Sequence, residues 1–133
     1  MSNNVILLIA RILLSFMFIM AGLSKFGGIA GTAGYIGSVG LPAPTLLAWL
    51  SGFWEVVAGI AVLIGFQTRW AALALSAFCV LTAVIFHTDF SDQMQMTIFM
   101  KNITIVGGLL ALFVAGPGSI SVDGRRGMAP AHA

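Results

Sequence analysis

The stretch LLAWLSGFWEVVAGIAVLIGF, residues Leu46 to Phe66, decides how the chain folds. It is nearly all apolar and carries one carboxylate, Glu55, near its middle. A helix of that length rises about 30 Å, which is the thickness of the hydrocarbon core of a bilayer. A lone carboxylate at that depth costs roughly 3 kcal/mol or more unless another group pairs with it. We therefore expect a membrane-spanning helix, and we expect the rest of the chain to supply partners for Glu55.

The composition of the whole chain is also that of a membrane protein. Of its 133 residues, 59% are hydrophobic and 8% are charged, whereas a soluble domain carries about 25% charged residues. No basic cluster exists beyond Arg125 and Arg126, so we expect no binding of nucleic acid. The single cysteine, Cys79, excludes an intramolecular disulfide, a C-x-x-C redox pair and a cysteine-based metal cage.

Three further apolar stretches are long enough to span a bilayer. The predicted spans are 5–23, 46–66, 70–86 and 97–115. The first has neither the positively charged start nor the A-x-A-like cleavage site of a signal peptide, so we interpret it as a span. We expect an all-α, integral membrane four-helix transmembrane bundle that forms one domain over residues 1–133, with a flexible tail at 119–133.

The connection between the first two spans, from Lys25 to Pro44, is unusually long and has a glycine at every third position from Gly28 to Gly40. It is consistent with a short helix in the outer interface, with a glycine-rich face against the bundle, or with a mobile loop. Tyr35 among apolar residues favours the interfacial helix.

The loops predict the orientation of the chain in the membrane. The basic residues Arg69, Arg125 and Arg126 fall on the side of the N-terminus, and Asp89 and Asp92 fall on the opposite side. Lysine and arginine accumulate on the cytoplasmic side of bacterial membranes. We therefore expect a multi-pass protein of the bacterial inner membrane with both termini in the cytoplasm.

The ionisable residues of every span fall on the helix face that also carries its small residues, which predicts a partly polar interior and an apolar outer surface. By helical rise, Arg11 and Lys101 approach Glu55 from opposite ends of the bundle, and Lys25 and His87 lie at the outer boundary. We therefore predict an interior site of Glu55, Arg11 and Lys101 with Lys25 and His87 at its outer mouth. These five residues are candidates for binding a ligand or handling protons, and none is assigned a catalytic role.

The charges of these candidates do not balance. Three cations, Arg11, Lys25 and Lys101, accompany Glu55 alone. Such an excess suits an oxyanion or a quinone carbonyl, since both accept hydrogen bonds. The structural alternative is an ion pair that only fixes the packing of the helices. We expect no metal site, because the donors near His87 are irregularly spaced.

A series of short motifs runs through the chain. They are Arg11-Ile-Leu-Leu14, Ala21-Gly-Leu-Ser-Lys25-Phe26, Gly40-Leu-Pro-Ala-Pro44, Glu55 with Gly59, Leu63-Ile-Gly-Phe-Gln-Thr-Arg69, His87, Lys101-Asn102, Gly107-Gly108-Leu-Leu110 and Gly116-Pro-Gly-Ser-Ile-Ser-Val-Asp123. In order and spacing, and over nearly the whole chain, they resemble the DoxX family of small membrane proteins. The resemblance implies a four-helix fold similar to subunits of thiosulfate:quinone oxidoreductase and to proteins that assist periplasmic redox enzymes.

These observations lead to one predicted function and two alternatives. We expect a quinone-linked or redox-associated membrane subunit, with quinone as the candidate cofactor and a redox enzyme as the candidate partner. The first alternative is a structural or assembly protein. The second is a small transporter acting as a homodimer, because the sequence has no internal repeat to supply its second half. The absence of a cysteine pair argues against direct thiol–disulfide chemistry, and the sequence does not decide whether the chain is an enzyme.

Overall fold

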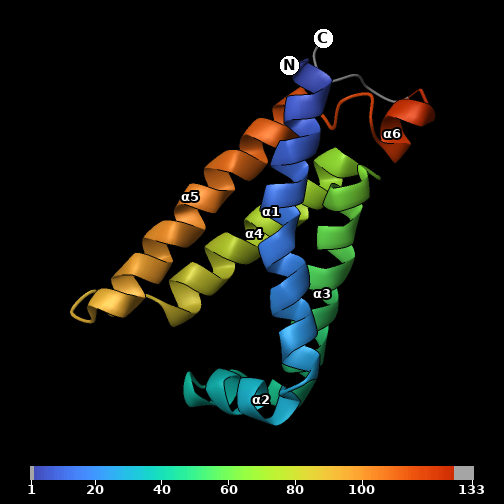
Figure 1. Ribbon diagram of the computed structural model, residues 1–133. Helices are drawn as coiled ribbons and strands as arrows, with labels where there is room; N and C mark the ends of the chain where they lie inside the picture. Colours follow the sequence, from blue (N-terminus) through green and yellow to red (C-terminus); the bar gives the residue numbers. More distant parts are fainter. Residues whose placement is uncertain (1, 128–133) are drawn as a thin grey trace.

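The computed structural model describes residues 2–127, which fold into helices and connecting turns (Figure 1). The four helices long and apolar enough to cross a membrane are α1 (Asn3–Phe26), α3 (Pro44–Ile64), α4 (Thr68–Phe86) and α5 (Gln93–Ala115). Two short helices, α2 (Ile29–Ser38) and α6 (Val122–Arg125), follow the first and the last of them. The predicted all-α membrane fold is confirmed, and so is a short helix between the first two spans.

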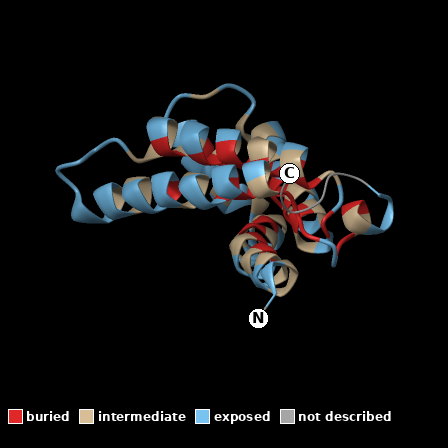
Figure 2. Ribbon diagram, turned by 90° about the horizontal axis from the view of Figure 1, so that it is seen from above, coloured by how far each residue is buried: buried red, intermediate tan, exposed pale blue. Residues whose placement is uncertain are grey.

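The long helices form two closely packed pairs, α1 with α3 and α4 with α5. The pairs approach one another at the end where α1 begins and α5 ends, and they diverge toward the opposite end (Figure 1). The short helix α2 lies at that opposite end, packed on α3. Figure 2 shows the buried residues concentrated where helices face one another, with exposed residues covering the outer surfaces.

Glycines allow α1 and α3 to lie very close together. A Cβ atom on Gly22 of α1 would lie 2.5 Å from Val56 Cγ2 and 2.8 Å from the carbonyl oxygen of Gly52, and a Cβ on Gly52 would lie 2.6 Å from Phe26 Cε1. Small residues at helix contacts are the usual basis of packing in lipid, where apolar side chains gain little by leaving the solvent. This contact fixes the register of α1 against α3 in the half of the pair nearer to α2.

The face of α2 that packs on the bundle differs from the predicted one. The sequence pattern led us to expect the glycines of this helix against the bundle, but a Cβ on Gly31 or Gly34 would meet nothing within 4 Å. The buried residues are Ala33 and Ile36, which pack with Ala48 of α3. Larger apolar side chains bury more area than glycine does, so they occupy the contact, and Gly31 and Gly34 face outward.

The tail is also more ordered than predicted. Within the described part of the chain, the segment 119–127 is folded, and the carboxylate of Asp123 is buried against the first residues of α4. Its Oδ1 accepts a hydrogen bond from the amide of Gln67 (2.8 Å), and its Oδ2 accepts bonds from the amide and the hydroxyl of Thr68 (both 2.9 Å). The amides that begin a helix lack partners within it, so Asp123 caps α4 from a distant part of the chain. Residues 128–133 of the predicted tail lie outside the described residues.

Candidate functional site

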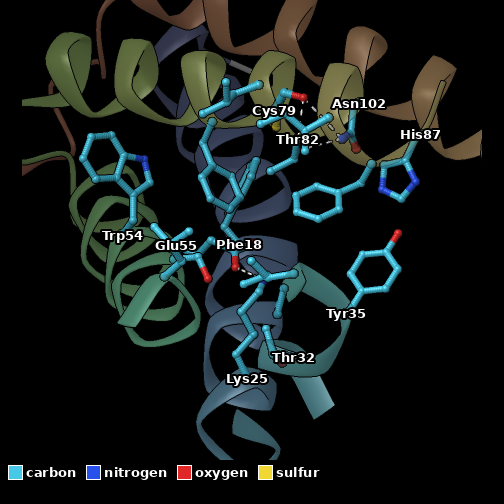
Figure 3. Close-up of a pocket in the computed structure, with 18 of the residues that line it drawn as sticks. Phe18, Lys25, Thr32, Tyr35, Trp54, Glu55, Cys79, Thr82, His87 and Asn102 are labelled. Carbon is cyan, nitrogen blue, oxygen red and sulfur yellow. Dashed lines mark hydrogen bonds and ion pairs between the residues drawn. The ribbon is translucent and has the colours of Figure 1, made fainter. Parts of the chain in front are cut away.

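A pocket of about 700 Å³ lies between the two helix pairs (Figure 3). This volume is within the range of small-molecule sites, which is about 300–1,000 Å³. Helices α1 to α5 all contribute to its wall, which is mainly apolar and includes aromatic side chains. The polar and aromatic side chains on this wall include Lys25, Tyr35, Trp54, Glu55, Phe78, Thr82, Phe86, His87, Lys101 and Asn102.

The carboxylate of Glu55 forms an ion pair with Lys25 on the wall of the pocket. Glu55 is buried on α3, and the Nζ of Lys25, near the end of α1, donates a hydrogen bond to its Oε1 (Figure 3). Each of these residues follows by one helical turn the glycine that brings its helix close, Gly22 on α1 and Gly52 on α3. The close glycine contact therefore places the lysine opposite the carboxylate.

Arg11 does not join this site, so the predicted pairing of Arg11 with Glu55 was wrong. The Arg11 side chain is fully buried and lies away from the pocket wall. Its Nη1 donates to the carbonyl oxygen of Leu63 at 3.0 Å, and its Nη2 donates to that of Ile120. The last carbonyl groups of a helix lack partners within it, so Leu63 at the end of α3 offers an acceptor. Arg11 thus joins α1 to α3 and to the segment before α6.

Lys101 of α5 lines the pocket, but its predicted pairing with Glu55 is not formed. Its Nζ lies 3.7 Å from the sulfur of Met17, which is a weak acceptor. Within residues 2–127 the ion pair of Lys25 with Glu55 is the one contact between a basic and an acidic side chain, so Lys101 has no carboxylate at ion-pair distance. The pocket therefore contains a cation whose hydrogen-bonding capacity is largely unused.

His87 lies at the end of α4 and also lines the pocket. Its Nδ1 is buried and has no hydrogen-bond partner among the described residues. Burial lowers the pKa of His87 below its ordinary value, and the positive charge of Lys101 lowers this pKa further. The imidazole therefore stays neutral down to a lower pH than an ordinary histidine does, and the neutral ring has one nitrogen that accepts and one that donates.

Asn102 was not among the predicted site residues. It is 8% exposed and lines the pocket beside Lys101. Its Nδ2 donates to the carbonyl oxygen of Cys79 and to the hydroxyl oxygen of Thr82, both at 3.3 Å, and so joins α5 to α4 (Figure 3). An amide inside a span was the signal that could have identified it, since polar side chains there usually bond to a neighbouring helix.

Comparison with known proteins places this architecture in a family. The family model DoxX matches residues 6–88, which is more than half of the chain. The chain belongs to the DoxX family. It is 42% identical to the inner membrane protein YqjF of Escherichia coli K12, over 91% of this chain and 92% of that protein. It is 40% identical to the inner membrane protein YphA of the same organism, over 93% of this chain and 92% of that protein.

A third relative has a name that refers to redox chemistry. CatD of Bacillus subtilis 168, named as a candidate oxidoreductase, is 35% identical over 59% of this DoxX chain and 56% of its own length. No solved structure shows a significant match. With two relatives named as inner membrane proteins and four apolar helices, this DoxX chain is an integral membrane protein.

The DoxX match contains part of the candidate site. Lys25, Glu55 and His87 lie inside residues 6–88, whereas Lys101 and Asn102 lie on α5, after the matched region. The pocket therefore combines an ion pair from the matched region with two polar groups from the last span.

Proposed function

We propose that this DoxX protein is a redox-associated subunit of the bacterial inner membrane whose pocket binds the head group of a quinone. The observation that carries the proposal is Lys101, an ammonium group without a carboxylate partner in the described chain, on the wall of an apolar pocket within the spans. An ionisable group at membrane depth usually has a function. A quinone carbonyl is an acceptor that this ammonium group can bind.

The other residues of the pocket fit such a ligand. Trp54, Phe78 and Phe86 supply aromatic surfaces for a flat ring, and exposed apolar residues such as Leu50 and Leu81 continue the wall toward the lipid. A lipid-soluble molecule can enter from the hydrocarbon through such a wall without crossing water. The volume of about 700 Å³ holds a substituted ring with the first part of a tail.

The residues of the pocket bind the quinone and transfer protons to it. A bound quinone carries two electrons and two protons when it is reduced. Lys101 donates a hydrogen bond toward the carbonyl oxygen, and the neutral imidazole of His87 can relay a proton at the α2 end of the pocket. The electrons must come from a partner protein, and the name of CatD as a candidate oxidoreductase supports such an association.

We also propose that both termini face the cytoplasm. The start of α1 and the end of α5 lie at the same end of the molecule, and so does α6 (Figure 1). Arg69, at the start of α4, and Arg125, in α6, belong to that end, so the basic residues favour its cytoplasmic placement. A fluorescent protein fused to the C-terminus should be bright in intact cells, whereas a periplasmic phosphatase fused there should be inactive. The reverse pattern would reject this orientation.

Direct measurement of quinone binding tests the main proposal. The protein is reconstituted in lipid nanodiscs with Trp49 and Trp70 replaced by phenylalanine, so that Trp54 on the pocket wall reports on binding. Titration with duroquinone should quench its fluorescence saturably. Lys101→Met should weaken binding about ten-fold or more, because a hydrogen bond from a charged donor contributes about 1.5–3 kcal/mol.

The matched control is Arg125→Met, which removes a positive charge from α6, outside the pocket, and should leave binding unchanged. Absence of saturable quenching in the unsubstituted protein, or equal affinity in Lys101→Met, would reject the quinone site. The structural alternative would then be favoured, because the side chains of Arg11, Glu55 and Asn102 all bond between segments of the chain.

A further inference from the structure

The orientation of the Asn102 amide is fixed by its neighbours on α4. The carbonyl oxygen of Cys79 can only accept a hydrogen bond, so the group that faces it at 3.3 Å must be the Nδ2 of Asn102. The same Nδ2 lies 3.3 Å from Thr82 Oγ1, whose own hydrogen points to the Cys79 carbonyl at 3.2 Å. Rotating the amide by half a turn would place two carbonyl oxygens against each other, which excludes the alternative orientation.

This arrangement leaves the Oδ1 of Asn102 as a free acceptor. Within residues 2–127 no group donates a hydrogen bond to this oxygen. The oxygen is not fully enclosed, because it keeps some accessible surface. Because Asn102 is more than nine-tenths buried and lines the pocket, the surface that this oxygen retains faces the pocket. The pocket thus presents a donor and an acceptor from consecutive residues of α5, Lys101 and Asn102.

We infer that Asn102 accepts a hydrogen bond from a hydroxyl group of the bound ligand, so that the pocket prefers a hydroquinone to the corresponding quinone. A quinone carbonyl has lone pairs and no hydrogen, so it meets the Asn102 oxygen as one acceptor against another. A hydroquinone hydroxyl can donate to Asn102 Oδ1 and, through its oxygen, accept from Lys101. This inference rests on the proposed function and adds to it which redox form the site selects.

The test compares duroquinol with duroquinone under nitrogen, using the same fluorescence of Trp54. The unsubstituted protein should bind duroquinol about ten-fold more tightly than duroquinone, since one net hydrogen bond is gained and an unpaired acceptor is avoided. Asn102→Leu removes the acceptor at similar volume and should bring the two affinities within about two-fold of each other.

Thr82→Val serves as the matched control for helix packing. It removes one acceptor of the Asn102 amide and keeps the bond to Cys79, so the preference for duroquinol should persist. A second measurement needs no variant. The dimethyl ether of duroquinol lacks both O–H donors and should bind the unsubstituted protein about ten-fold more weakly than duroquinol.

The outcomes separate the two proposals. Equal binding of duroquinol and duroquinone, or of duroquinol and its ether, overturns the role of Asn102 and leaves the quinone site standing. Equal loss of the preference in Thr82→Val and Asn102→Leu assigns the effect to the packing of α4 on α5 and also overturns it. Failure of both redox forms to bind overturns the proposed function together with this inference.

Discussion

Lys25 Nζ donates a hydrogen bond to Glu55 Oε1 and so joins the end of α1 to the middle of α3. The two side chains differ in exposure, since 24% of the lysine side chain and 5% of the glutamate side chain are accessible. The lysine can extend along its own helix toward the interface, whereas the carboxylate has no such route. Loss of the ion pair therefore leaves the Glu55 carboxylate buried without a partner, whereas Lys25 can still reach water.

This asymmetry predicts unequal costs for removing either partner. Lys25→Met leaves an unpaired buried carboxylate and should destabilise the protein by about 3 kcal/mol. Glu55→Gln leaves a lysine that can reach water and should cost about 1 kcal/mol or less. Unfolding in mixed micelles as a function of denaturant measures both values. The double variant should recover most of the loss of Lys25→Met, and a larger cost for Glu55→Gln than for Lys25→Met would contradict the prediction.

The glycine contact between α1 and α3 predicts a steric effect. Gly22→Ala places a methyl group 2.5 Å from Val56 Cγ2 and 2.8 Å from the carbonyl oxygen of Gly52, so the helices must move apart. We expect a loss of about 1–3 kcal/mol, measured by thermal unfolding in detergent. Gly107→Ala is the matched control, because it also lies inside a long helix but its Cβ would meet nothing within 4 Å. That variant should be neutral or more stable by up to about 1 kcal/mol. Equal effects of the two substitutions would show that the contact is not tight.

The Asp123 cap predicts that the tail stabilises the start of α4. Asp123→Asn replaces a carboxylate oxygen with an amino group facing the N–H groups of Gln67 and Thr68, and should cost about 2 kcal/mol. Hydrogen exchange at those two amides should become faster. Asp92→Asn is the control, because Asp92 caps α5 in an exposed position and asparagine caps a helix equally well. Unchanged exchange at Gln67 and Thr68 in Asp123→Asn would refute the cap.

The sequence was sufficient for the fold because hydrophobic length determines the spans. The four apolar stretches predicted four spanning helices, and Tyr35 with its apolar neighbours favoured the short helix after the first of them. The face of that helix was predicted wrongly, because glycine spacing shows where backbones can approach and not which side chains gain from burial. The folded structure of the tail was not predicted, because its contact with the start of α4 joins residues more than fifty positions apart in the sequence.

Which residues form the site could be predicted only in part from the sequence. Helical rise gives the depth of a side chain but not its direction around the bundle, so Lys25 pairs with Glu55 where Arg11 was expected to do so. Arg11 found carbonyl acceptors at its own end of the bundle, and the stem of Lys25 extended inward to Glu55. Lys101 and His87 both line the pocket between the helices, and their predicted part in binding a ligand or handling protons stays a prediction.

The proximity of Lys101 to His87 predicts a measurable electrostatic coupling. Burial, and then the charge of Lys101, lower the pKa of His87 from its ordinary value of 6.5. Lys101→Met should therefore raise this pKa toward 6.5, and Arg125→Met should not change it. The titration is followed by NMR of labelled histidine, with the second histidine of the chain, His132, replaced by alanine so that one signal remains. The folded state takes up the proton at a lower pH than the unfolded state does, so stability should fall as the pH is lowered through 6.5. His87→Gln should weaken that dependence. A His87 signal that titrates identically with and without Lys101 would show that the two side chains are not coupled. It would also contradict the proposed proton relay by His87.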